Sequence, residues 1–149
     1  MVYVGLDGIK QEGAETFMIT KTLKIDGKNV TFGASAGTVR AYRNRFGRDI
    51  IKDVAELYKS LEEANINAGA AEDLSDSEKI AAASALPVFA LETFENLAYI
   101  MAKAVDSTIP DDVGEWLDEF NSFSIYEVAP ALIALWAANT KTTATPKKK

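Results

Sequence analysis

The 149-residue chain contains no cysteine and no histidine. Without cysteine it can form no disulfide and offers no thiolate as a nucleophile, redox partner or metal ligand. Without histidine it lacks the commonest general base at neutral pH and the usual imidazole ligand of zinc, copper and haem iron. We therefore expect a protein that is not an enzyme and that binds no cofactor and no metal ion.

Basic charge and long hydrophobic runs are also scarce. The formal net charge is −6 and the sequence pI is about 4.7, which argues against binding to the phosphate backbone of nucleic acids. The first residues, MVYVGLDGIKQEG, have neither the basic region nor the apolar core of a secretory signal. No hydrophobic stretch is long enough to span a bilayer. We expect neither nucleic acid nor a membrane as a partner.

The hydrophobic fraction of 48% is ample for one folded domain. After Thr20, apolar residues alternate with polar ones on both sides of the turn pair Asp26 and Gly27, and this pattern predicts a β-hairpin. Helical periodicity dominates the rest. The sequence therefore predicts an α+β, predominantly α-helical fold, with an N-terminal β-hairpin packed on a bundle of about five helices. The predicted divisions are a loosely ordered extension (1–19), a single domain (20–139) and a disordered basic tail (140–149).

Two helices are predicted directly after the hairpin. The first ends at Gly47, which suits a left-handed residue, and the second begins at Asp49, which suits a helix cap. Their apolar stripes contain Val39, Tyr42 and Phe46 in the first helix and Ile50, Val54, Leu57, Tyr58 and Leu61 in the second. The polar, alanine-rich segment 65–76 interrupts this periodicity and is predicted to be a mobile loop.

A third helical region opens with Ser75 and Glu78 at the spacing of a capping box and runs to about Ala104. Pro87 lies inside this region and is expected to split it near Ala85, because proline lacks the backbone donor and clashes with the preceding turn.

The two tryptophans mark two more helices between Thr108 and Asn139. Thr108 and Pro110 suit an N-cap and a first turn, and predict where the Trp116 helix begins. The second helix begins at Ser124 and is apolar on nearly every side. We therefore expect it to be buried within its own fold or against a partner. The residues predicted to contact a client or a second copy are Leu132, Ile133, Leu135 and Trp136 in this helix, followed by Phe89, Leu97 and Met101 in the region split by Pro87.

Two charged groups suggest other functions. The acidic residues between 111 and 119 could hold magnesium or calcium, but acids in a first helical turn complement the helix dipole, and we prefer that interpretation. Arg40, Arg43, Arg45 and Arg48 suggest a helix that enters the major groove of DNA. Arg45 lies well round the helix axis from Arg40 and Arg43, so we prefer a solvated helix face.

An ordered series of segments resembles the tail assembly chaperones of long-tailed, siphovirus-type bacteriophages and prophages of Gram-positive bacteria. The likeness covers the chain from about Thr20 onward, and no counterpart is matched before it. Its segments are LKIDGKNVTF, TVRAYRNRFGRDIIKD, FENLAYIMAKAVD, IPDDVGEWLDEF, SIYEVAPALIALW and NTKTTATPKKK.

The resemblance implies a non-enzymatic factor of virion morphogenesis. Members of the family bind and solubilise the tape measure protein during tail tube assembly, then give way to the tail tube protein and are released before the tail is complete. On this basis we expect a homo-oligomer in the host bacterial cytoplasm that is absent from the mature virion. Lys147, Lys148 and Lys149 raise the hypothesis of a programmed frameshift, which an underlying codon run without a slippery heptamer would contradict; a plain solvated tail is the other interpretation.

Two alternatives belong to other classes of protein. One is a structural minor tail or connector protein that is retained in the virion, which mass spectrometry of purified particles would reveal. The other is a small DNA-binding regulator, whose affinity for duplex DNA would depend on salt and on Arg40 and Arg43.

Overall fold

The computed structural model describes residues 18–66 and 74–144. Within them two strands and six helices follow one another, and the predicted α+β, mainly helical class with a hairpin on helices is confirmed. The predicted extension (1–19) lies almost wholly outside the described residues, as do most of the predicted mobile loop and residues 145–149. The elements are β1 (Ile19–Ile25), β2 (Lys28–Ala34), α1 (Thr38–Phe46), α2 (Ile50–Glu63), α3 (Asp76–Ser84), α4 (Val88–Val105), α5 (Val113–Leu117) and α6 (Ile125–Ala144).

The antiparallel hairpin turns at Asp26 and Gly27, both of which have positive φ, as the sequence predicts. The register pairs Leu23 with Val30 and Lys21 with Phe32, so these four side chains share the face that packs on the helices. Phe32 is fully buried there, whereas Lys21 at the same level remains exposed. The hairpin therefore contributes one apolar face to the core, and its outer face is polar.

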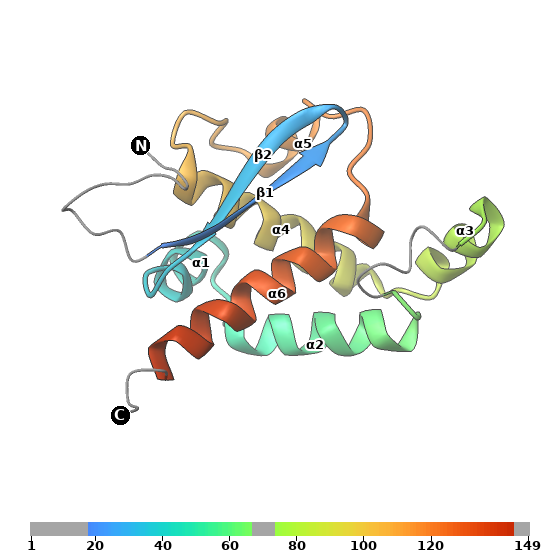
Figure 1. Cartoon of the computed structure of the whole chain (residues 1–149), viewed down its shortest axis with the longest axis horizontal. Coiled ribbons are helices and arrows are strands. Elements are labelled where there is room, and N and C mark those ends of the chain that lie inside the picture. Colours follow the sequence, from blue (N-terminus) through green and yellow to red (C-terminus); the bar gives the residue numbers. More distant parts are fainter. Residues whose placement is uncertain (1–17, 67–73, 145–149) are drawn as a thin grey trace.

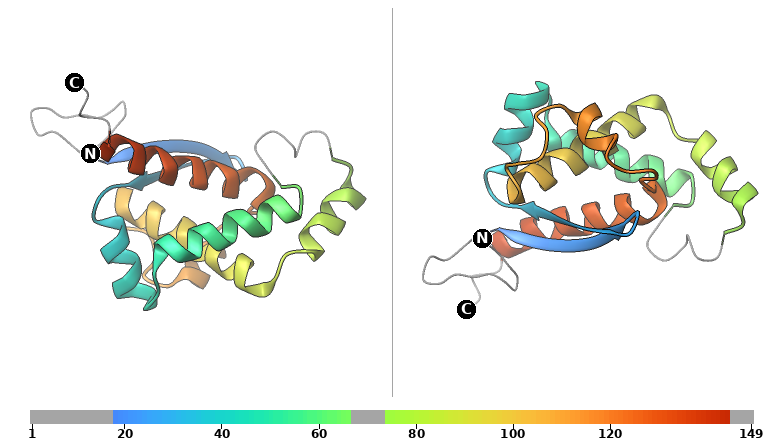
Figure 2. Two further views of the ribbon diagram at one scale, coloured as in Figure 1. Left: turned by 90° about the horizontal axis from the view of Figure 1, so that it is seen from below. Right: turned by 90° about the horizontal axis from the view of Figure 1, so that it is seen from above.

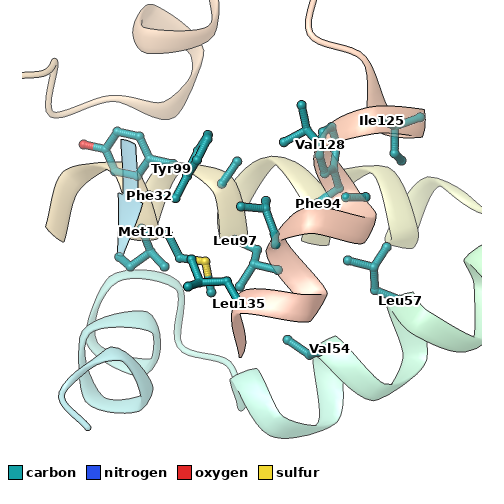
Figure 3. Packing of buried hydrophobic residues seen from close by; sticks show 14 of the residues in the cluster. Phe32, Val54, Leu57, Phe94, Leu97, Tyr99, Met101, Ile125, Val128 and Leu135 are labelled. Carbon is teal, nitrogen blue, oxygen red and sulfur yellow. The ribbon is translucent and has the colours of Figure 1, made fainter. Parts of the chain in front are cut away.

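The fold has two layers around α4. Figures 1 and 2 show the hairpin and α6 on one side of α4, with α1 and α2 on the other. β2 packs mainly on α4, and β1 packs on α6. Leu97 and Met101 of α4 reach the centre of the buried cluster, where they meet Leu135 of α6 and Phe32 of β2 (Figure 3). Burial of apolar side chains between these layers is the main force that holds the domain together.

The predicted helix signals mark the observed boundaries in the first half of the chain. α1 ends at Gly47 in a left-handed conformation, and the Asp49 side chain accepts a hydrogen bond from the amide of Ile51 at the start of α2. Ser75 and Glu78 form the predicted capping box of α3. Pro87 separates α3 from α4, so the predicted split is confirmed.

The predicted start of the Trp116 helix is wrong. Asp112 rather than Thr108 caps α5, which begins at Val113 and is only five residues long. The carbonyl oxygens of Ile109 and Pro110 accept hydrogen bonds from side chains of α4 and are not available to a helix. The segment before Asp112 is therefore an extended loop held on α4.

The predicted end of the last helix is also wrong. α6 continues to Ala144, past the predicted domain boundary at Asn139. Starting a helix fixes several residues for one hydrogen bond, whereas each residue added afterwards gains one bond for one residue fixed. A helix can therefore extend beyond the residues that pack on the core. The hydroxyl of Thr140 also donates to the carbonyl oxygen of Ala137 at 2.8 Å, within the helix.

No helix in the described ranges, 18–66 and 74–144, is both long enough and apolar enough to cross a lipid bilayer.

Candidate interaction surface

Large apolar side chains on the outer side of α2 are exposed to solvent. Ile51 is 59% exposed and Tyr58 is 49% exposed, and the two lie two turns apart with the exposed Ala55 between them. Val54 and Leu57, on the inner side of the same helix, are buried in the core. α2 therefore has a wider apolar surface than the fold covers.

A buried polar group fixes the orientation of α2. Asp53 accepts hydrogen bonds from the hydroxyl of Tyr42 at 2.9 Å and from the Arg48 guanidinium at 2.8 and 3.0 Å. The guanidinium also lies 5.4 Å from the centre of the Phe89 ring, so the contact joins α1, α2 and α4. At 100° per residue, Ile51 and Tyr58 lie on the flank of α2 away from Asp53. They therefore point away from α1.

The ionisation of the Tyr42 hydroxyl reflects this environment. Burial, and after it the hydrogen bond to the Asp53 carboxylate, raises the pKa of Tyr42 above its ordinary value. The hydroxyl stays protonated and remains a donor at physiological pH. The group has a satisfied donor and a paired carboxylate, so we assign it a structural role.

One side of α6 carries apolar side chains that the core covers only in part. The hydroxyl of Tyr126 donates to the main-chain carbonyl oxygen of Lys79 in α3, so the side that carries Tyr126 faces away from the hairpin. Ile133 follows Tyr126 by two turns on that side, and Trp136 lies one turn further. Both are partly buried against the core and keep part of their surface in water.

We call the surface formed by Ile51, Ala55, Tyr58, Ile133 and Trp136 the α2–α6 strip. Its two halves come from helices that are far apart in sequence. Ile133 and Trp136 pack against the buried cluster, whereas Ile51 and Tyr58 are exposed. A single apolar side chain on a protein surface is ordinary, but several large ones on one small domain mark a surface suited to a partner.

Of the seven predicted contact residues, four lie in the core, two lie in the strip and one lies in neither. Leu97, Met101, Leu132 and Leu135 are buried in the core, which corrects the expectation that they form an exposed surface of the monomer. α4 lies between the two layers, and α6 packs on the hairpin and on α4, so the widest part of their apolar surface is covered. Ile133, Trp136 and Phe89 retain partial exposure, and only the first two belong to the strip. Their binding to a client remains a prediction.

α3 is the least buried helix of the fold. None of its residues is buried, and Ile80 is 70% exposed. It stands at one end of the long axis of the molecule in every view (Figures 1 and 2). Three of the exposed large apolar residues, Ile80, Val88 and Leu91, lie in the segment from α3 to the start of α4.

The charged groups singled out in the sequence have structural roles. The Arg45 side chain donates to the main-chain oxygen of Asp111 and lies over the ring of Tyr99, and Arg48 pairs with Asp53. Arg40 and Arg43 are exposed, and their guanidinium groups form no hydrogen bond or ion pair with the parts of the chain that the structure describes. Two arginines on a short helix do not form a dense basic surface.

The acidic residues between 111 and 119 do not converge on one point. Asp112 caps α5, and Lys103 pairs with Asp111 at 2.8 Å, which lowers the pKa of that carboxyl. No group of three or more potential metal ligands occurs among the residues described by the structure. The dipole-complementing interpretation therefore agrees with the observed cap.

Sequence reasoning missed Ile51 and Ile80 as surface residues. Ile80 carried a usable signal, because it is the one large apolar side chain between Asp76 and Ser84 and no i+3 or i+4 apolar partner of similar size accompanies it. Ile51 gave no such signal. It is next to Ile50, an identical side chain that belongs to the buried stripe of the helix, and the sequence does not distinguish the two.

Comparison with protein-family models, with curated proteins and with solved structures gave no significant match.

Proposed function

We propose that this protein is a tail assembly chaperone of a siphovirus-type bacteriophage or prophage, and that it holds apolar helical segments of the tape measure protein on the α2–α6 strip. The observation that carries the proposal is the exposure of Ile51 and Tyr58 on a folded domain, together with the partial exposure of Ile133 and Trp136 on a second helix. An amphipathic client helix can place its apolar face on such a surface.

The resemblance in sequence supports the proposal because its segments coincide with elements of the fold. LKIDGKNVTF spans the hairpin, TVRAYRNRFGRDIIKD covers α1 and the start of α2, and SIYEVAPALIALW begins α6. The strip draws on the second and third of these segments.

The acidic charge of the domain suits the same role. A net charge of −6 keeps a complex with an apolar client dispersed by mutual repulsion. In this proposal the chaperone acts in the host bacterial cytoplasm, is displaced by the tail tube protein and is absent from the finished virion.

Co-expression with the tape measure protein of the same tail gene cluster tests the proposal. We expect the wild-type chain to keep the tape measure protein in the soluble fraction and to co-purify with it. A double variant, Ile51→Asp with Tyr58→Asp, should abolish both effects while the chaperone itself stays folded. Val88→Asp is the matched control, because Val88 is an apolar residue that is 74% exposed at the start of α4 and outside the strip.

Two outcomes would overturn the proposal. A tape measure protein equally soluble without the chain would remove the need for a chaperone. Equal rescue by the double variant would show that the strip does not bind the client. Mass spectrometry of purified virions separates the chaperone from a retained minor tail protein, because only the latter would be present at a fixed stoichiometry.

A further inference from the structure

α3 is a helix that the body of the fold hardly covers. None of its residues is buried, and Ile80 is 70% exposed. Ala82 is the one apolar residue of α3 that packs, in part, against the buried cluster. The free energy of a local opening grows with the apolar area that it exposes, so α3 should leave the body far more easily than the buried helix α4.

The helical order of α3 comes from its own first turn. The hydroxyl oxygen of Ser75 accepts from the amide of Glu78 at 3.2 Å, and the Glu78 carboxylate accepts from the amide of Ser75 at 2.9 Å. This reciprocal capping box satisfies two amides that the helix itself cannot. Because both bonds lie within the segment, they move with α3 and do not fasten it to the body.

A single side chain ties α3 to the rest of the fold. The hydroxyl of Tyr126 in α6 donates to the carbonyl oxygen of Lys79. Within 18–66 and 74–144 this is the one hydrogen bond or ion pair that joins α3 to another helix or strand. A carbonyl oxygen has two lone pairs, so the bond to Tyr126 can break while Lys79 keeps its place in the helical ladder.

The chain between α3 and α4 has the properties of a pivot. The amides of Ala85 and Leu86 bond back to the carbonyl oxygens of Ala82 and Ala83. Pro87 follows in an extended conformation, with ψ of 156°, and it has no N–H to carry the hydrogen-bond ladder into α4. The Leu86 side chain is buried, so this point stays on the body when α3 moves.

We propose that α3 is a hinged flap that separates from the body as a unit about Leu86 and Pro87, with the Tyr126 hydroxyl as the latch that holds it closed. In the closed form the flap covers part of Tyr126 at the start of α6. In the open form Tyr126 and Ala82 are both in water.

The latch sets the cost of reaching the covered surface. A partner that contacts Tyr126 and Ala82 can bind only the open form, so its apparent affinity is reduced by the fraction of time that the flap is open. This control acts at α3 and the start of α6, and it does not depend on the proposed function or on the α2–α6 strip.

Native-state hydrogen exchange of the full-length chain tests the flap. The amides of 79–84 should share one opening equilibrium and be on the order of a hundredfold less protected than the amides of 97–101 in α4. Because opening exposes little surface, exchange at 79–84 should depend weakly on urea and exchange at 97–101 strongly. Protection that falls gradually along α3 would show fraying, and protection equal to that of α4 would show that α3 opens only with the whole domain. Either result overturns the proposal.

Replacing Tyr126 with phenylalanine tests the latch. Tyr126→Phe removes one hydrogen bond and should accelerate exchange at 79–84 by about threefold to tenfold, while exchange at 97–101 stays unchanged. Tyr58→Phe, which removes an exposed hydroxyl from another helix, is the matched control and should change neither region. No acceleration at 79–84, or equal acceleration at 97–101, overturns the assignment of the latch.

Thiol labelling gives an independent reading, because the natural chain has no cysteine. The thiol of Ala82→Cys is partly covered in the closed flap, whereas that of Ala81→Cys is exposed in either form. We expect a disulfide reagent to react more slowly with Ala82→Cys, and Tyr126→Phe to raise that rate and leave the rate of Ala81→Cys unchanged. Equal rates for the two thiols, or a rate at Ala82→Cys that Tyr126→Phe does not change, would overturn the proposal.

Discussion

The hydroxyl of Tyr42 in α1 donates a hydrogen bond to the carboxylate of Asp53 in α2 across 2.9 Å, and both side chains are buried. The Arg48 guanidinium, itself half in water, completes the pairing of that carboxylate. A buried carboxylate is tolerated only when donors surround it. This contact fixes the rotation of α2 about its axis and so decides that Ile51 and Tyr58 point outward.

Replacing Tyr42 with phenylalanine removes one donor and leaves the ring in place. We expect Tyr42→Phe to lower the free energy of unfolding by about 1–2 kcal/mol, because Asp53 keeps only the Arg48 guanidinium. Urea denaturation followed by circular dichroism measures the difference. The matched control is Tyr58→Phe at an exposed position, which should change the stability little; equal losses in the two variants would contradict a special role for the buried pair.

The same hydroxyl predicts a pH dependence. Burial and Asp53 raise the pKa of Tyr42 in the folded chain, so an unfolded chain ionises first as the pH rises. The stabilisation is fully present below the ordinary tyrosine pKa near 10 and is lost above it. The stability difference between the wild type and Tyr42→Phe should therefore shrink between about pH 9 and pH 11. A constant difference would show that the hydroxyl titrates normally.

Lys103 should hold the loop that precedes α5. Its ammonium group donates to the carbonyl oxygens of Ser107 and Ile109 and pairs with Asp111 at 2.8 Å. Lys103→Met keeps the aliphatic stem but leaves these acceptors without the cation, so amide hydrogen exchange across 106–112 should accelerate. We expect a loss of about 1–2 kcal/mol in global stability. Lys59→Met, at an exposed position, is the control, and unchanged exchange in the loop would refute the assignment.

Gly33 in β2 should not tolerate a side chain. A β-carbon there would lie 2.8 Å from Cγ2 of Val105 and would also collide with the side chain of Met18. We expect Gly33→Ala to cost about 1–3 kcal/mol, as overpacking does elsewhere. Gly37→Ala, where the nearest side-chain atom is 3.7 Å away, should be far milder. Adding both Met18→Ala and Val105→Ala to Gly33→Ala should restore part of the loss relative to the same double variant with Gly33, and failure to do so would exclude the collision as its cause.

The two tryptophans should report different environments. Trp116 is buried among the rings of Tyr99, Phe120 and Phe123, whereas Trp136 keeps part of its surface in water. Trp136→Phe, with Trp116 alone, should fluoresce at shorter wavelength and resist acrylamide. Trp116→Phe, with Trp136 alone, should be quenched readily and become protected when a partner covers the strip. Protection of Trp136 in the free monomer would contradict its place in the strip.

Local chemistry explains why much of the fold could be predicted. Asp26 with Gly27, Ser75 with Glu78, and Pro87 act on their immediate neighbours, so the turn, the capping box and the helix break needed no knowledge of the tertiary structure. The start of α5 could not be predicted without the tertiary structure. The carbonyl oxygens of Ile109 and Pro110, just before α5, accept hydrogen bonds from side chains of α4 and so cannot take part in a helix.

The sequence predicted an exposed apolar helix surface but not which residues form the strip. A surplus of apolar helix surface is visible in sequence, but which residues are covered depends on how neighbouring layers lie across each helix. Leu132 and Ile133 are adjacent and equally apolar, yet only Leu132 points between the layers and is buried. Ile50 and Ile51 differ in the same way at the start of α2.

The placement of Lys21 has a consequence for material handled at high concentration. Lys21 shares the core-side face of the hairpin with Phe32, and the exposed Lys24 follows it on the same strand. An ammonium group directed toward the apolar face opposes the addition of another strand along β1, because stacking would desolvate it. Prolonged storage should therefore not produce thioflavin-binding fibres that grow by strand addition along β1.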